Sequence, residues 1–251
     1  MKDPNVSGAK RLAFFLPNSF TALNMACGFS SIILSLQGRA FDAALILVLG
    51  AIFDSVDGRV ARMTGTQSEF GEQFDSISDV ISFGIAPSLL IYLHSLQTMG
   101  RIGAVVSFIY LLCGALRLAR FNANIDKVSS DFFQGLPIPG GALVVIGFVF
   151  ISNELKMIND FPVAALIITF VTSILMISNI PFCSFKNSQY IRDHKRKVLF
   201  LMFILGVLTF TYYTYMFFIN MAVYIVASII YYLFNRKQAG DIFEWKSDKE
   251  D

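Results

Sequence analysis

One run of the chain, residues 198–235, contains no charged residue and constrains the fold more than any other feature. Because an α-helix rises 1.5 Å per residue, this run is nearly twice as long as a helix that crosses a hydrocarbon core about 30 Å thick. It therefore predicts two membrane-spanning helices. Tyrosine is enriched at membrane interfaces, so we expect the turn between these helices near the tyrosines of residues 212–215.

Six further apolar stretches predict additional spans, and the composition agrees, since 55% of the residues are hydrophobic and only 15% are charged. The second stretch is too short to cross a bilayer alone, so its helix must continue past Asp54. We expect an all-α polytopic membrane protein of about eight transmembrane helices, with one transmembrane domain over residues 1–236 and a short polar tail over 237–251. The six stretches are residues 12–38, 43–53, 80–100, 102–116, 132–153 and 161–185.

The distribution of basic residues predicts the orientation in the membrane. With eight spans, the turns on one side carry only Arg39, Arg101 and Lys156, whereas residues 184–197 on the other side carry five basic residues. An excess of Lys and Arg is typical of cytoplasmic loops. We therefore expect both termini and residues 54–79 at the cytoplasmic face of the cell membrane. The net charge of +2 gives no reason to expect binding to nucleic acid.

The charged stretch at residues 54–79 places four aspartates at membrane depth. Two sets of residues within it recur at intervals of three or four, so each set shares one face of a helix. A turn near residues 64–68 would make the two helices antiparallel neighbours, and the carboxylates would then converge. The first set is Asp54, Asp57, Gly58, Ala61 and Arg62, and the second is Gly71, Asp75 and Asp79.

Four uncompensated carboxylates at membrane depth would cost on the order of 10 kcal/mol, and crowded carboxylates also repel one another. One or two divalent cations would remove this penalty. Oxygen ligands with no nearby histidine or cysteine favour Mg²⁺, Mn²⁺ or Ca²⁺ over zinc. Arg62 could meet a phosphate as a forked donor. Two other interpretations stay open at this point: an ion or proton pathway across the membrane, and a helix pair whose charges are solvated.

The two sets together resemble, at every fixed position, the signature of the CDP-alcohol phosphatidyltransferases: D-x-x-D-G-x-x-A-R from residue 54, then G-x-x-x-D-x-x-x-D from residue 71. The resemblance implies a transmembrane helical enzyme, usually a homodimer. Such an enzyme moves a phosphatidyl group from a CDP-linked lipid to an alcohol and releases CMP.

The same resemblance implies a role for each motif residue. The four aspartates would hold two Mg²⁺ or Mn²⁺ ions, and Asp79 would also deprotonate the acceptor hydroxyl. The polar residues Asn18, Thr21 and Asn24, spaced by three on the first span, would either reach the cytidine diphosphate or hydrogen-bond between helices. The implied metal ligands are Asp54, Asp57, Asp75 and Asp79, and the implied contacts to cytidine diphosphate are Gly58, Ala61, Arg62 and Gly71.

Further stretches are similar to the integral-membrane phosphatidylserine synthases, which implies CDP-diacylglycerol, or an ether-lipid analogue, as donor and L-serine as acceptor. These stretches are LPNSFTALNMACGF from residue 16, LRLARFN from 116, FQGLPIPGGA from 133 and SNIPFCSFK from 178. Arg117 and Arg120, with Lys186, could bind the serine carboxylate, or they could anchor the protein at lipid phosphates. Glycerol 3-phosphate or inositol as acceptor, and a cation transporter, remain alternatives.

Overall fold

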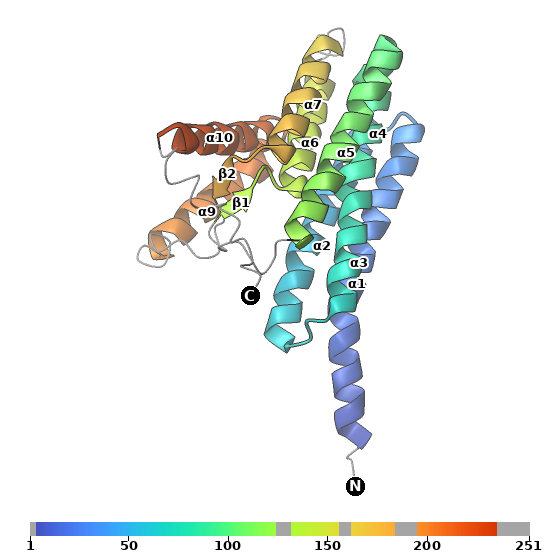
Figure 1. Cartoon of the computed structure of the whole chain (residues 1–251), viewed down its shortest axis with the longest axis vertical. Coiled ribbons are helices and arrows are strands. Elements are labelled where there is room, and N and C mark those ends of the chain that lie inside the picture. The colour runs from blue at the N-terminus through green and yellow to red at the C-terminus, as the bar shows by residue number, and fades with distance from the viewer. Residues whose placement is uncertain (1–3, 124–131, 156–161, 184–194, 235–251) are drawn as a thin grey trace, which may run out of the picture. The chain divides into compact units, whose positions relative to one another are not determined.

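The computed structural model describes residues 4–123, 132–155, 162–183 and 195–234, and nearly all of them are helical (Figure 1). The chain forms two compact units, residues 1–111 and 112–251. The elements are α1 (Pro4–Leu36), α2 (Ala40–Thr64), α3 (Glu69–Asp79), η1 (Val80–Ile85), α4 (Ala86–Ile91), η2 (Tyr92–Leu96), η3 (Gln97–Met99), α5 (Arg101–Ala123), β1 (Phe132–Gln134), α6 (Ile138–Glu154), α7 (Pro162–Ile177), β2 (Pro181–Cys183), α9 (Lys195–Thr211) and α10 (Tyr213–Phe234).

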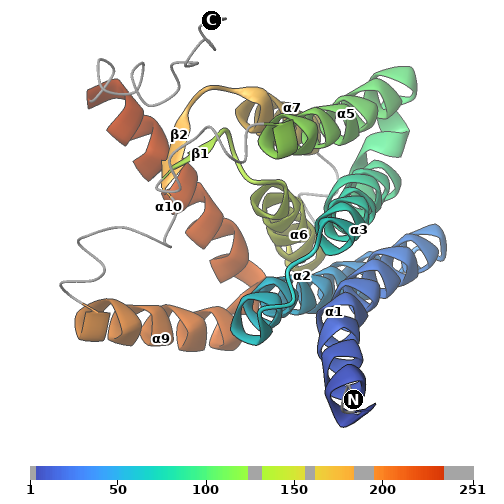
Figure 2. The same ribbon diagram turned by 60° about the horizontal axis from the view of Figure 1, so that its bottom comes forward.

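The first unit is built around α1, which packs along α2 and against the start of the continuous helical segment Glu69–Met99 (Figures 1 and 2). The approach is close because Gly28 has no side chain: a Cβ atom there would lie 2.8 Å from the Cα atom of Ser82. The Ser82 hydroxyl donates a hydrogen bond of 2.9 Å to the carbonyl oxygen of Asn24. This contact holds η1, which directly follows α3, beside the second half of α1.

The second unit contains the end of α5, the helices α6, α7, α9 and α10, and a small sheet. Helix α6 packs against α10 and α7, and the ring of Phe150 on α6 lies 5.8 Å from Tyr213 and 5.7 Å from Phe217, between centroids. Strands β1 and β2 pair antiparallel, with Phe133 opposite Phe182. The all-α prediction missed this pair, because strands of three residues carry no periodic signal.

The helix boundaries agree with the predicted turns. Helix α2 ends at Thr64 and α3 begins at Glu69, while α9 ends at Thr211 and α10 begins at Tyr213. Within the described part of the chain, 4 helices are long and apolar enough to cross a membrane, and α6 and α7 are shorter apolar helices. The count of eight spans and the orientation stay predictions. The four candidate spans are Phe15–Leu36, Glu69–Met99, Arg101–Ala123 and Tyr213–Phe234.

Gly135 connects β1 to α6 in a conformation that only glycine adopts readily, with φ +77°. A Cβ atom at Gly135 would collide with the carbonyl oxygen of Met176 and would lie 2.9 Å from that of Ser178. We expect Gly135→Ala to destabilise the protein by about 2–4 kcal/mol, because backbone strain and crowding add. Thermal unfolding in detergent measures the loss.

Gly38 offers a matched control, because its φ is +75° and no atom lies within 4 Å of the position of its missing Cβ. Gly38→Ala therefore carries the backbone strain alone, about 1–2 kcal/mol. Equal losses of stability in the two variants would contradict the crowding at Gly135.

Candidate functional site

The structure brings aspartates of α2 and α3 together in the first unit. Asp54, Asp57 and Asp75 each offer a carboxylate oxygen, and these oxygens lie within 4.8 Å of one another. Asp57 is buried. The side chain of Asp79 on α3 adjoins that of Asp54. Three of the four predicted metal ligands therefore lie within reach of one ion, and the fourth, Asp79, adjoins Asp54.

The cluster fits a divalent cation. A single ion holds its oxygen ligands roughly 3–5 Å apart, which is the separation found here. One carboxylate oxygen of Asp75 and one of Asp79 are buried without a hydrogen-bond partner among the described residues. Buried anionic oxygens of this kind are stabilised by a positive charge. The donor set, carboxylate oxygens only, suits Mg²⁺, Mn²⁺ or Ca²⁺.

Helix α1 contributes to this cluster through Thr21. The Thr21 hydroxyl donates a hydrogen bond of 2.9 Å to the carboxylate of Asp57, and both residues are buried. The carbonyl oxygen of Thr21 in turn accepts a hydrogen bond of 3.1 Å from Ser78 on α3. Thr21 therefore links α1 to the helices on both sides of the cluster and orients Asp57. A hydrogen bond between helices was one of the two alternatives that the sequence left open for Thr21, whereas its contact with the cytidine diphosphate stays a prediction.

The other predicted contacts of the cytidine diphosphate lie on the same helices. At the start of α3, a Cβ atom on Gly71 would lie 3.5 Å from the side-chain oxygen of Asn18 on α1. On α2, a guanidinium nitrogen of Arg62 lies 3.5 Å from the position that a Cβ atom of Gly58 would take. Arg62 is exposed, whereas Gly58 and Ala61 are half-buried. The small residues leave the backbone accessible beside an exposed cation.

Asn24 is the third of the polar residues spaced by three on α1, and it is buried. Its side chain is fully buried, and neither polar atom of its amide has a hydrogen-bond partner among the described residues. The amide oxygen lies 3.1 Å from the position of a Cβ atom on Gly50. The spacing of three between Asn18, Thr21 and Asn24 places all three on one face of α1, and a contact of Asn24 with the cytidine diphosphate stays a prediction.

Two arginines at the end of α5 lie in the second unit. Arg117 is buried, and its guanidinium carbon lies 5.3 Å from the ring centroid of Phe121 and 5.8 Å from that of Phe133. Arg120 donates hydrogen bonds to the backbone at the ends of β1 and α7. Lys186 lies outside the described residues. The predicted binding of a serine carboxylate by these three residues stays a prediction.

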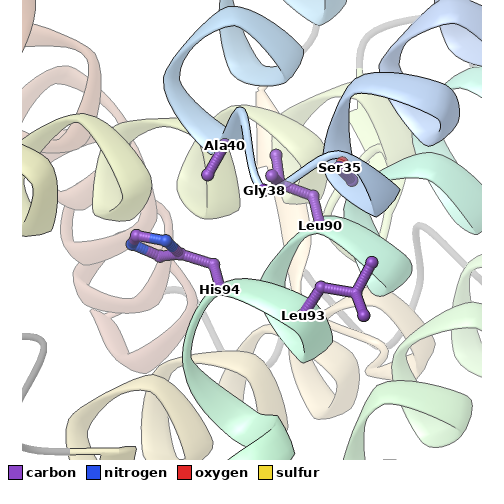
Figure 3. A pocket seen from close by; sticks show the side chains of 6 residues that line it. All are labelled: Ser35, Gly38, Ala40, Leu90, Leu93 and His94. Atoms are coloured by element: carbon purple, nitrogen blue, oxygen red, sulfur yellow. The ribbon is translucent and has the colours of Figure 1, made fainter.

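A cavity of about 200 Å³ lies elsewhere in the first unit, where the turn between α1 and α2 meets α4 and η2 (Figure 3). None of its lining residues belongs to the predicted site. His94 and Leu93 line it from η2, as Figure 3 shows. The remaining lining residues are Ser35, Gly38, Ala40 and Leu90.

Comparisons with known proteins agree with the motif. The family model for CDP-alcohol phosphatidyltransferase matches residues 14–183. A CDP-diacylglycerol–serine O-phosphatidyltransferase of Helicobacter pylori (strain ATCC 700392 / 26695) is 35% identical over 88% of this chain and 92% of its own length. A protein of the same name from Methanocaldococcus jannaschii is 42% identical over 68% of this chain and 75% of its own.

An archaetidylserine synthase of Methanothermobacter thermautotrophicus is 38% identical over 66% of this chain and 69% of its own length. The matched region contains the whole aspartate cluster, Thr21, Arg117 and Arg120. The prediction of the family, and with it of a transferase, is therefore confirmed: the chain belongs to the CDP-alcohol phosphatidyltransferase family.

Proposed function

We propose that the protein transfers the phosphatidyl group of CDP-diacylglycerol to the hydroxyl group of L-serine and releases CMP. The observation that carries this proposal is the aspartate cluster, which can hold the divalent cations that a diphosphate binds, together with the flanking Arg62 and the small residues that leave the backbone open. Relatives named for this reaction, at 35% and 42% identity, support serine as the acceptor. Serine-dependent release of CMP by the purified protein tests the proposal.

The four aspartates would hold one or two Mg²⁺ or Mn²⁺ ions, which supply positive charge to the diphosphate and to the departing CMP. Arg62 adds a guanidinium that can bind phosphate oxygens. Gly58, Ala61 and Gly71 let the nucleotide approach the backbone. On this proposal Asn18 and Thr21 line the same site from α1.

Asp79 is the proposed general base. Its carboxylate takes the proton from the serine hydroxyl, the hydroxyl oxygen forms a bond to the phosphorus that carries the diacylglycerol, and the bond from that phosphorus to CMP breaks. The buried carboxylate oxygen of Asp79, which has no partner among the described residues, supports this role because it can accept a proton.

Arg117 is the proposed binding residue for the serine carboxylate. Phe121 and Phe133 hold its guanidinium against their rings, and the polar edge of a stacked guanidinium can still bind a carboxylate. We expect Arg117→Gln to raise the KM for L-serine by about 10–100-fold, because a hydrogen bond to a charged group contributes about 1.5–3 kcal/mol. The KM for the CDP-lipid should change little. Steady-state kinetics with each substrate varied in turn measures both values.

Arg59 on α2 is a suitable control for Arg117, because it is an exposed arginine outside the predicted site. Arg59→Gln should leave both KM values near those of the wild type. If Arg117→Gln raised the two KM values equally, Arg117 would not be a residue of the acceptor site.

Thr21→Val should weaken the metal site without removing a metal ligand. The variant loses the hydrogen bond to Asp57, and loss of a residue that orients a ligand lowers metal affinity about 10–100-fold. We expect the Mn²⁺ concentration for half-maximal CMP release to rise about tenfold or more. Thr21→Ser keeps the hydroxyl and should stay near the wild type. An unchanged Mn²⁺ requirement in Thr21→Val would contradict the orienting role.

The arrangement in the membrane completes the proposal. We place eight helices across the cell membrane, both termini and the aspartate cluster at its cytoplasmic face, and two copies of the chain in a homodimer. The apolar helices support the membrane spans, and the five lysines and arginines within positions 184–197 support the orientation. Labelling of single cysteines introduced at residues 38 and 65 tests it, since only the former should react from outside the cell.

A further inference from the structure

We infer that Arg120 is a positioning residue that holds Arg117 in place, and that it does not itself bind the acceptor. The inference rests on the proposed function, because it assigns Arg117 to the carboxylate of L-serine. It changes the role that the sequence predicted for Arg120. The contacts of its guanidinium carry the argument.

The two terminal nitrogens of Arg120 are surrounded by backbone oxygens. Nη1 donates to the carbonyl oxygen of Ile177 at 3.0 Å and to the side-chain oxygen of Asn179 at 3.3 Å. Nη2 donates to the carbonyl oxygens of Gln134 at 2.9 Å, Ser178 at 3.2 Å and Met176 at 3.4 Å. The four hydrogens of these nitrogens thus meet five acceptors. A substrate carboxylate would have to displace carbonyl oxygens that close the end of α7.

These contacts tie three segments of the second unit together. Arg120 belongs to the last turn of α5, Gln134 is the last residue of β1, and residues 176–179 are the last two residues of α7 and the two that follow it. The side chain of Gln134 adds a hydrogen bond of 2.9 Å to the oxygen of Asn179 that Arg120 also contacts. Arg120 therefore fixes β1 relative to both helices.

The position of β1 determines where Arg117 can lie. Phe133 precedes Gln134 in β1, and its ring centroid lies 6.3 Å from that of Phe121 on α5. The guanidinium of Arg117 lies over both rings. If β1 shifts, one of the two rings leaves Arg117, and the guanidinium loses its fixed direction. Arg120 thus acts on the acceptor through β1 and Phe133.

The test compares L-serine with L-serinamide, which has nearly the same shape but no carboxylate charge. The kcat/KM for each compound, or its strength as a competitive inhibitor, gives a preference ratio for the charged acceptor. We expect Arg117→Gln and Arg120→Gln each to lower this ratio at least tenfold. The double variant should lower it no further, because the two residues act on one contact. A purely structural defect would lower activity with both compounds equally and leave the ratio unchanged.

Two further variants keep the result interpretable. Arg101→Gln, at the other end of α5, should keep the wild-type ratio. Asn179→Ala removes one acceptor of Arg120 and leaves the backbone contacts, so it should lower the ratio about threefold. If Arg120→Gln does not fold, the ratio of Asn179→Ala tests the role of Arg120 in its place. An unchanged ratio in Arg120→Gln, or in Asn179→Ala when only that variant folds, would overturn the inference. So would strictly multiplicative effects in the double variant. Absence of serine-dependent CMP release in the wild type would instead refute the proposed function.

Discussion

We expect Asp79→Asn to lower serine-dependent CMP release by about 10²–10⁴-fold, the range over which a general base contributes to catalysis. The amide of asparagine has nearly the shape of the carboxylate but cannot take the proton of the serine hydroxyl. It can still donate a hydrogen bond to Asp54, the partner of Asp79 in the cluster, so the fold should persist. Binding of the CDP-lipid, measured by calorimetry with Ca²⁺ or Mn²⁺ present, should remain within a few-fold of the wild type.

Glu72 provides the control for Asp79, because it is an exposed acid on the same helix. Glu72→Gln should retain full activity. If Asp79→Asn lost binding of the CDP-lipid together with activity, Asp79 would be a residue that holds metal and donor, and the base would have to be found elsewhere.

Asp75→Asn should abolish most of the dependence of stability on divalent ions. In the wild type, Mn²⁺ at a hundredfold excess over its dissociation constant should stabilise the folded protein by about 2.7 kcal/mol. Asp75 supplies one of the three oxygens that lie within 4.8 Å of one another, so its loss lowers the affinity of the site for the ion. Without divalent ions the substitution should have the opposite effect on stability. The variant should then unfold at a higher temperature than the wild type, because one of several crowded negative charges is gone.

Thermal unfolding with chelator and with Mn²⁺ measures both effects. Asp42→Asn is the matched control, since Asp42 also lies on α2 but forms an exposed ion pair of 2.8 Å with Arg39. It should respond to Mn²⁺ as the wild type does. An equal rise of the unfolding temperature with Mn²⁺ in wild type and Asp75→Asn would contradict a metal site at this cluster.

The helices and the aspartate cluster could be predicted from the sequence because each has a local signal. An uncharged run marks a membrane helix, and the spacing of Asp54 and Asp57, or of Asp75 and Asp79, fixes a helical face. The turns near residues 64–68 and 212–215 followed from composition. The family followed from the motif, because all of its fixed positions lie within residues 54–79.

The contacts that depend on distant segments could not be predicted in this way. Thr21 and Asp57 are 36 residues apart, and only the packing of α1 brings the hydroxyl to the carboxylate. Arg120 shows the same limit more clearly. From the sequence it is a cation three residues after Arg117, equally suited to a substrate carboxylate. Its donors in fact meet acceptors at the end of β1, 14 residues further on, and around the end of α7, 56–59 residues further on.

Release of CMP from CDP-diacylglycerol by the purified protein tests the proposed function most directly. The assay is run with Mn²⁺ or Mg²⁺ and with L-serine, glycerol 3-phosphate, inositol or no acceptor. The proposed function predicts release that depends on L-serine and on the divalent ion, with phosphatidylserine formed in equal amount. Release stimulated by glycerol 3-phosphate or inositol instead would contradict serine as the acceptor. If the folded protein released no CMP with any acceptor and instead carried cations across liposome membranes, the proposed enzymatic activity would be contradicted.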